Sequence, residues 1–551
     1  MSDYKQFHEF SVAGSDEVII VQNGAGDFVI EGAAGARHEI LDAVAAGAGT
    51  AFTTVGDGPA RRVRRTWLDT FDWRLYRAGL ALEQRSGNGG TELILTGRDG
   101  EWLASLPVAA GNGRAGSNGT GPPSWPSLTA ALPPGPLREL LEPVAGIRAL
   151  SPVARAASRI RERRVLNSDT KTIARLIVDE MSVSYPASAH AAPRLTVLPV
   201  RGYRAQSERL SSALTANAGI LPSGRSALEI ALDAAGQHPG RRTAPVELTA
   251  AMPAAAALTA ILTAQLDVLE ANVPGTIRDI DTEFLHDLRI AIRRTRSALK
   301  LAGRVLPAGL ADRYRPEFKW LGDLTTPTRD LDVYLLGFEQ MTAGLIGAEE
   351  EDLRPFLAYL MRARATAQRD LARGLRSARF GRLTRQWRAD LAVVRPPRKR
   401  PTAAQLAGQR IAAAQRRALR AGERITAVSP ATDLHELRKD CKELRYMIEL
   451  FGSLHDPEMR WQAVRELKAL QDCLGEFQDA EVQRAEIHTF AERMLAERSA
   501  PAATLLAMGE IAAGLARRQR QARADFDSRF AAFASRPSQA RLAALTEPGG
   551  I

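Results

Sequence analysis

The pattern of apolar positions divides the chain into two halves of different texture. Up to about residue 230, short runs of β-branched or alternating apolar residues are mostly bounded by turn residues, which is typical of β-strands. The predicted strands lie at 17–22, 28–30, 81–85, 91–96, 172–178 and 195–198. Strands this short, separated by turn signals, favour one antiparallel sheet or barrel.

From Glu247 onward, Ala, Leu, Arg and Glu recur with a period near 3.6 residues, which predicts helices. The fold class is therefore α+β with two domains, an N-terminal antiparallel β-barrel and a C-terminal all-α domain of two repeated helical bundles. Stretches rich in Gly, Pro or Arg predict a linker and a break between the bundles. The predicted limits are 1–235 for the barrel, 236–247 for the linker, 248–540 for the helical domain, and about 250–394 and 402–540 for its two repeats.

The two helical parts are related by an internal repeat. When the chain is shifted by 149 positions, residues 285–333 align without a gap on 434–482, and 13 of the 49 positions are identical. The identical pairs include rare residue types and several cations: His286/His435, Arg289/Arg438, Arg296/Arg445, Gly303/Gly452 and Lys319/Lys468. An ungapped match of this kind predicts a duplicated helical unit.

Each copy of the repeat carries a row of basic residues along one helix. In the first copy the row is His286, Arg289, Arg293, Arg296 and Lys300, and in the second it is His435, Arg438, Lys442 and Arg445. At 100° per residue the first row lies within an arc of about 80° and extends for roughly 21 Å, beside an apolar stripe. Like charges three and four positions apart repel each other, so the rows predict an extended polyanionic ligand.

The residues also leave a structural alternative open. The cations could be solvated, or paired with acids of a neighbouring helix, for which Asp323, Asp330 and Asp332 are candidates. Lys319 and Lys468, which the repeat also pairs, could instead close the other side of a basic groove. No metal site or other cofactor is predicted, because neither row offers a second His or Cys three or four residues from its histidine.

Charge and composition point to an anionic partner of the C-terminal half. The 551 residues carry a net charge of +11. Residues 1–250 hold 27 basic and 25 acidic residues, a net charge of +2, whereas residues 251–551 hold 47 and 38, a net charge of +9. Two cysteines exclude a disulfide framework and favour a reducing cytoplasm. Neither a secretory signal nor an apolar run of about 18 residues is present, so no membrane association is expected.

The helical half resembles the CHAD domain family over roughly 250–540. The resemblance rests on the spacing His-x-x-Arg-x-x-x-Arg/Lys-x-x-Arg at the start of both rows. It also rests on Trp320-Leu-Gly-Asp323 and Arg329-Asp-Leu-Asp-Val333, with a weaker second copy at 470–482. The resemblance implies that the basic face binds inorganic polyphosphate and that the protein is found at polyphosphate granules.

The N-terminal half is similar to the CYTH domain, a triphosphate tunnel barrel. The resemblance is carried by Trp67-Leu-Asp-Thr70, by 75–82 and by Arg85. The family's enzymatic residues are largely replaced. The opening Glu-x-Glu-x-Lys reads Lys5-Gln-Phe7-His-Glu9, the later Lys is Thr96, and the later Glu-x-Glu is Thr196-Val-Leu198. Alternating carboxylates would hold divalent metal in such a barrel, so no catalytic residue is predicted. Four arginines of this half could still bind phosphate: Arg85, Arg161, Arg163 and Arg175.

These observations lead to one main hypothesis and two alternatives. The main hypothesis is a non-enzymatic cytoplasmic protein that binds polyphosphate in a basic groove between the two helical repeats. In the first alternative the barrel is a metal-dependent triphosphatase to which the helical domain recruits substrate. In the second, the groove binds RNA or DNA, although aromatic side chains for base stacking are missing from the stripe between His286 and Lys300.

Overall fold

A computed structural model describes residues 26–30, 48, 52–56, 59–98, 100–108, 124–216, 220–239, 246–303, 305–395 and 401–546. The chain forms two compact units, Met1–Arg242 and Thr243–Ile551. The strand expected at 17–22 and the degenerate motif at Lys5, Phe7 and Glu9 lie outside the described residues. The domain limits at 1–235 and 248–540 stay predictions.

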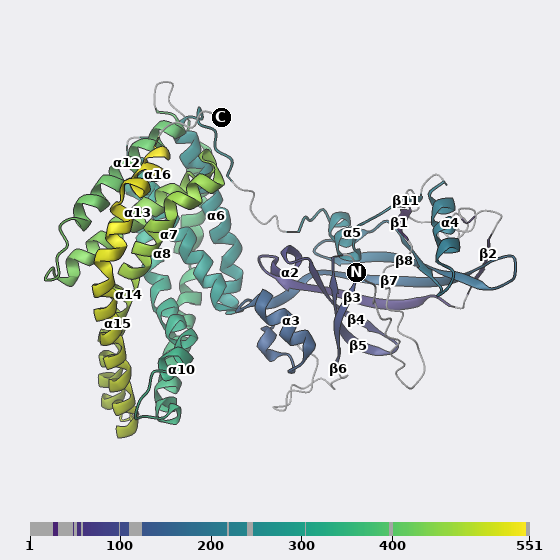
Figure 1. Ribbon diagram of the computed structural model, residues 1–551, viewed down its shortest axis with the longest axis horizontal. Helices are drawn as coiled ribbons and strands as arrows, with labels where there is room; N and C mark the ends of the chain where they lie inside the picture. Colours follow the sequence, from purple (N-terminus) through teal and green to yellow (C-terminus); the bar gives the residue numbers. More distant parts are fainter. Residues whose placement is uncertain are drawn as a thin grey trace. The chain divides into compact units, whose positions relative to one another are not determined.

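The first unit is an antiparallel sheet that curls into a half-barrel (Figure 1). Its described strands are β1 (Gly26–Ile30), β2 (Thr53–Gly56), β3 (Arg61–Thr70), β4 (Leu80–Gly87), β5 (Gly90–Gly97), β6 (Trp102–Val108), β7 (Leu150–Leu166), β8 (Thr172–Tyr185), β9 (Ala189–His190), β10 (Arg194–Pro199) and β11 (Ile220–Pro222). The sheet order is β11-β1-β10-β8-β7-β3-β4-β5-β6, with β2 on β7 and β9 on β8. The predicted antiparallel fold is confirmed. Among the described strands the path remains open, with β11 and β6 at its edges.

Helices cover parts of both faces of the sheet. The helices of this unit are α2 (Arg74–Arg77), α3 (Pro136–Ala145), α4 (Arg204–Thr215) and α5 (Ala227–Ala234). On one face Leu176 and Val178 of β8 pack in a cluster with Leu210 of α4; we call this the α4 face. On the opposite face Met181 of β8 packs with Leu228 of α5, and we call this the α5 face. Because side chains alternate along a strand, every residue of β8 belongs to one of these two surfaces.

The second unit is helical and shows the predicted repeat directly (Figure 1). Its helices are α6 (Ala254–Arg278), α7 (Thr282–Ala302), α8 (Leu310–Leu336), α9 (Phe338–Thr342), α10 (Arg354–Leu375), α11 (Ala378–Ala392), α12 (Ala403–Gly422), α13 (Ala431–Leu450), α14 (Pro457–Ala496), α15 (Ala502–Ala534) and α16 (Arg536–Ala544). The first residues of α6 and α12 are 149 positions apart, and so are those of α7 and α13. This is the same shift that aligns the two copies in sequence, and the helical C-terminal fold is confirmed.

A pair of backbone hydrogen bonds joins the starts of the two repeats. The N–H of Ala254 donates to the carbonyl of Pro401 at 3.0 Å, and the N–H of Ala403 donates to the carbonyl of Met252 at 2.7 Å. Donors and acceptors are each 149 positions apart, and the antiparallel bridge between them joins Pro253 to its equivalent Thr402. A local twofold axis therefore relates the two hydrogen bonds, and with them the starts of the two repeats, to each other.

One hydrophobic core serves both repeats. Leu288 of α7 and Leu437 of α13 belong to the same cluster of buried residues. In this core the fully buried Trp387 packs against Tyr314, with ring centroids 4.4 Å apart, and against Phe318 at 5.7 Å. Aromatic pairs at these separations stabilise beyond the area they bury. The shared core holds α7 and α13 in a fixed relation, so the positions of the two basic rows are set by packing.

Helix α6 satisfies the length and hydropathy of a membrane span, and among the described helices it alone does so. Its mean hydropathy over the most apolar window is 1.4. Leu258, Ile261 and Leu262 of this helix are nevertheless buried in the core that both repeats share. A helix buried on this scale is apolar because protein surrounds it, so its composition is explained by its place in the core.

Candidate functional site

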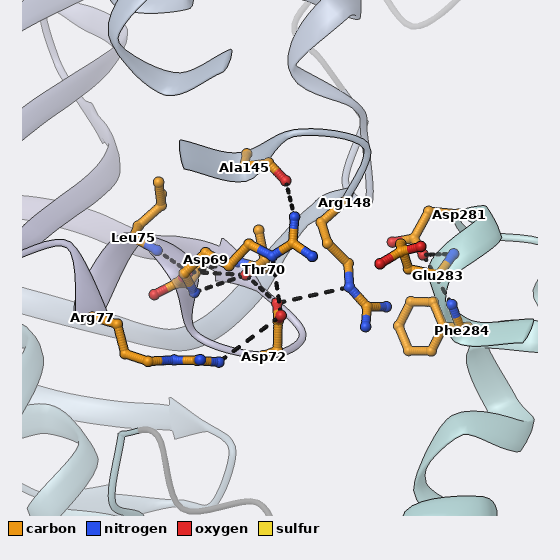
Figure 2. A network of polar contacts seen from close by, with 11 residues as sticks. Asp69, Thr70, Asp72, Leu75, Arg77, Ala145, Arg148, Asp281, Glu283 and Phe284 are labelled. Carbon is orange, nitrogen blue, oxygen red and sulfur yellow. Dashed lines mark hydrogen bonds and ion pairs between the residues drawn. The ribbon is translucent and has the colours of Figure 1, made fainter. Parts of the chain in front are cut away.

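The first basic row lies on α7, whose start is fixed by a side-chain cap. Asp281 accepts hydrogen bonds from the backbone N–H groups of Glu283 at 3.0 Å and Phe284 at 3.2 Å (Figure 2). Such a cap satisfies donors that a helix end otherwise leaves free. The apolar stripe of α7 is buried in the core, and the cations lie beside it as predicted. His286, Arg289 and Arg293 are half-buried, whereas Arg296 and Lys300 are exposed.

Arg289 is held by hydroxyl groups of α8. Its Nη1 donates to Oγ1 of Thr325 at 2.8 Å and to Oγ1 of Thr326 at 2.9 Å. Its Nε is buried without a hydrogen-bond acceptor in the described part of the chain. The hydroxyls orient the guanidinium without forming an ion pair with it, so the group remains able to bind an anion.

Gly322 explains why a glycine stands in the Trp-Leu-Gly-Asp motif. A Cβ at this position of α8 would lie 3.2 Å from Nη1 of Arg296 and 3.9 Å from Ile292. A side chain would therefore require the end of Arg296 to move by a few tenths of an ångström. The glycine leaves room for Arg296 beside α8.

Arg329 of α8 joins the first row, although sequence reasoning did not select it as a binding residue. Burial lowers the pKa of His286 below its ordinary value, and the nearby charge of Arg329 lowers it further. Burial also lowers the pKa of Arg289; the nearby carboxylate of Asp330 opposes this effect, and the charges of Arg293 and Arg329 add to it. The Nη1 of Arg329 is buried and finds no acceptor among the described residues. Burial and the neighbouring arginines therefore disfavour the charged form of the His286 imidazole.

The second row lies on α13, and acids or amides hold much of it. Nδ1 of His435 is 2.9 Å from Oε1 of Gln478. Two ion pairs follow: Arg438 with Asp479 at 2.9 Å and Arg445 with Glu449 at 2.7 Å. The alternative in which acids neutralise the cations therefore describes part of the second row.

The two rows converge at a pair of equivalent residues. Burial lowers the pKa of Lys442, and the charges of Arg438, Arg293 and Arg445 lower it further. Arg293 belongs to the first repeat and occupies the position equivalent to Lys442. Cations from both repeats therefore face each other where α7 contacts α13.

The remaining predicted site residues divide into paired and unpaired groups. Lys300 forms an ion pair with Glu443 of α13, and Lys319 forms one with Asp323 at 2.7 Å. Asp332, proposed above as a partner of the row, instead pairs with Arg364 at 2.8 Å. Within the described ranges, the cationic or imidazole groups of the site that form no ion pair are His286, Arg289, Arg293, Arg296, Arg329, His435, Lys442 and Lys468.

The four arginines proposed for the first unit do not form one site. Arg163 lies opposite Leu176 in the register of β7 and β8, so Arg163 and Arg161 belong to the α4 face. Arg85 lies opposite Arg65, which lies opposite Ala156, so Arg85 belongs to the α5 face together with Arg175. Directly opposed residues share a face of an antiparallel pair. The set is divided between the two surfaces.

A buried ion network occupies the α5 face, and sequence reasoning missed it. Arg65 donates from Nε and Nη2 to Glu83 at 2.8 and 2.7 Å, and from Nη1 to Asp179 at 2.8 Å. Arg85 adds a second cation to Glu83 at 2.9 Å. Although burial opposes it, the two arginines hold the pKa of Glu83 well below its usual range. Arg175 is engaged separately, by Glu162 at 3.3 Å.

The Trp-Leu-Asp-Thr motif has a structural role in the turn after β3. Asp69 accepts from the backbone N–H groups of Thr70 at 2.7 Å, Leu75 at 3.0 Å and Tyr76 at 2.9 Å (Figure 2). Burial raises the pKa of Asp69 to about 6, against the effect of these hydrogen bonds. Asp72 accepts from Oγ1 of Thr70 at 2.8 Å. These carboxylates build the turn into α2.

Two positions at which the family that the first unit resembles carries functional residues hold neutral threonines. Oγ1 of Thr96 donates to the carbonyl of Ala81 at 3.4 Å, and Thr196 is buried in the sheet. Across the described ranges, no group of three or more His, Cys, Asp or Glu side chains is arranged to hold a metal ion.

Comparison with known proteins identifies one domain family in the helical unit. The sequence profile of the CHAD domain matches residues 260–488. A search among curated proteins finds no match. The crystal structure of the CHAD domain from the plant Ricinus communis shares 26% identity, covers 54% of this chain and 96% of its own, and superposes with a TM-score of 0.45. PptA from Streptomyces chartreusis shares 20% identity and covers 50% of this chain and 99% of its own, with a TM-score of 0.40.

The first unit has a weaker match. A putative adenylate cyclase from Bacillus halodurans shares 14% identity, covers 29% of this chain and 76% of its own, and gives a TM-score of 0.21.

Proposed function

We propose that this chain, which carries a CHAD domain at residues 260–488, binds inorganic polyphosphate along its two basic rows. The domain belongs to a family linked to polyphosphate binding in general. The observation that carries the proposal is that Arg293 of the first repeat and Lys442 of the second, neither of which forms an ion pair within the described ranges, lie where α7 contacts α13, so that the charge of Arg293 lowers the pKa of Lys442. Clustered cations repel one another, so an anion that lies between them stabilises the folded protein.

The unsatisfied donors favour an oxyanion as the ligand. Nε of Arg289 and Nε of Arg438 are repeat equivalents, and both are buried without an acceptor among the described residues. Nη1 of Arg329 is also buried without an acceptor among the described residues. A buried donor without a partner is costly, and charge-assisted hydrogen bonds to phosphate are among the strongest that arginine makes. Three such donors in one site fit a ligand with many phosphate oxygens.

A linear chain fits the site better than a single phosphate or a nucleic acid. The row on α7 alone extends roughly 21 Å, which is several phosphate units long. The stripe between His286 and Lys300 presents no aromatic side chain on which bases could stack. The groove between the two repeats is therefore proposed as a polyphosphate site, with nucleic acid as the weaker competitor.

The direct test is a titration of the full chain with long-chain polyphosphate between 0.05 and 0.3 M salt. We expect tight binding whose log affinity falls linearly with log salt, because each phosphate contact releases counterions. Single-stranded RNA, added at equal phosphate concentration, should displace polyphosphate poorly. Binding that is absent at 0.15 M salt, or equal displacement by RNA, would contradict the proposal.

We further propose that the first unit has no metal-dependent triphosphatase or cyclase activity. The support is that Glu83 and Asp179, two carboxylates of the α5 face, are both bound by Arg65. A carboxylate held by a guanidinium is a poor ligand for Mg²⁺ or Mn²⁺. We expect no release of phosphate from ATP or tripolyphosphate in either metal. Turnover that EDTA abolishes and that co-purifies with the protein would show the proposal to be wrong.

The proposed location is the cytoplasm, on polyphosphate granules, because granules are the concentrated form of this polymer. A fluorescent fusion of the full chain should coincide with granules stained for polyphosphate. A uniform distribution in cells that contain granules would contradict this location.

A further inference from the structure

The two repeats differ at three equivalent positions of the site, in charge at two of them and in a hydroxyl group at the third. Position 300 of the first repeat is Lys, whereas its equivalent in the second is Glu449. Position 329 is Arg, and its equivalent is Gln478. Position 325 is Thr, and its equivalent is Leu474. Each change makes the second row less able to hold an exchangeable anion.

The loss of hydroxyl groups redirects Arg438. In the first repeat Arg289 donates to Thr325 and Thr326, but the equivalents of these threonines are Leu474 and Gly475, which offer no side-chain acceptor. Arg438 turns instead to the carboxylate of Asp479 at 2.9 Å. Arg289, by contrast, forms no ion pair with Asp330, the equivalent of Asp479; that carboxylate is near enough to raise the pKa of Arg289 but does not bond to it.

A second carboxylate, that of Glu449, forms an ion pair with Arg445, the next arginine of the second row. Arg445 pairs with Glu449 one helical turn away at 2.7 Å. The equivalent pair in the first repeat is Arg296 and Lys300, which repel each other. Arg296 remains exposed and without an ion pair in the described structure.

We propose that the first repeat is the principal phosphate-binding surface, and that Asp479 and Glu449 compete with phosphate for the arginines of the second. The proposal rests on the polyphosphate-binding function given above. The side chain of Arg438 is only 16% exposed, whereas that of Asp479 is 61% exposed. The carboxylate can therefore move into solvent and leave the guanidinium in place for a phosphate. The second repeat binds only when the local phosphate concentration is high enough to displace these acids.

The test is polyphosphate affinity of the full chain carrying Asp479→Asn, with Glu449→Gln as a second variant. An exposed ion pair corresponds to a factor of about five at most, so we expect Asp479→Asn to bind about two- to fivefold more tightly. The salt dependence of log affinity should steepen by up to about 0.9, the value for one added contact on a nucleic-acid backbone. Glu449 also contacts Arg294 at 3.3 Å, so its variant requires a thermal melt alongside.

The matched control is Glu492→Gln, which removes the same charge from the same helix. It lies 13 residues from Asp479, or about 20 Å along α14. Affinity gained equally by Glu492→Gln and Asp479→Asn would show a general charge effect and overturn the proposal.

The reversal Arg293→Glu distinguishes failure of the proposed competition from failure of the proposed polyphosphate-binding function. If it abolishes binding while Asp479→Asn binds like wild type, the competition is wrong and the function stands. If Arg293→Glu also binds like wild type, the proposed function itself fails.

Discussion

Replacing both Arg289 and Arg293 by Glu should lower the affinity for long-chain polyphosphate by at least about a hundredfold at 0.15 M salt. Hydrogen bonds to charged groups contribute about 1.5–3 kcal/mol each, and two lost contacts give roughly two to four decades. The introduced carboxylates would also repel the polymer. Because fewer counterions are released, the slope of log affinity against log salt should flatten by about 0.7–0.9 for each lost contact.

Two comparisons decide whether this loss is local. Arg517→Glu with Arg520→Glu makes the same charge change at exposed positions of α15 and should bind nearly as wild type does. Arg438→Glu with Lys442→Glu should weaken binding less than the reversal in the first repeat, because Asp479 already engages Arg438. Circular dichroism melts are needed for all three, since Arg289 is half-buried. If Arg517→Glu with Arg520→Glu loses as much affinity as Arg289→Glu with Arg293→Glu, the loss is due to net charge and not to the proposed site.

Replacing Arg65 by Met should destabilise the first unit by about 3–5 kcal/mol at pH 7. This is the range for removing one partner of a buried ion pair, because the remaining charges are left without compensation. Arg65 and Glu83 are each 7% exposed, and so is Asp179. Urea unfolding, followed by the fluorescence of the tryptophans that this unit contains, measures the change.

The pH dependence of this variant has a definite sign. In the wild type the pKa of Glu83 is depressed, so its contribution to stability is present at neutral pH and is lost as the pH falls through the folded-state value. In Arg65→Met, Asp179 loses its cation and Glu83 keeps only Arg85, so lowering the pH should reduce the defect. Adding Glu83→Gln to Arg65→Met should restore part of the stability at pH 7. A variant as stable as wild type at every pH would show that the network is not coupled to folding.

The basic rows could be predicted from sequence because helical periodicity alone places His286, Arg289 and Arg293 on one side of α7. The same reasoning could not select Arg329, because the side of α8 that faces α7 is decided by packing around Gly322. Nor could it find the pair of Arg438 and Asp479, since 41 residues separate the partners. The repeat contained one usable signal: the motif residue Arg329 is Gln in the second copy.

The sheet was harder to predict in detail, for a different reason. Strand β7 carries arginines at alternating and adjacent positions, and these charges hide the apolar alternation by which strands are recognised. The division of Arg161 and Arg163 from Arg85 and Arg175 depends on cross-strand register, which the sequence of one strand does not determine. Arg65 and Asp179 are 114 residues apart, so only the folded sheet brings them together.

The backbone bridge between Pro253 and Thr402 bears on which polymers the helical unit can accept. A local twofold axis presents each half of a bound chain with a related surface, met in opposite directions. A nucleic-acid strand has distinct 5′ and 3′ ends, so its two halves would meet the repeats with opposite polarity. Linear polyphosphate is chemically identical in both directions, so its two halves can meet the two repeats in the same way. If the helical unit binds polyphosphate as proposed, we therefore expect its duplication to favour a polymer that has no direction.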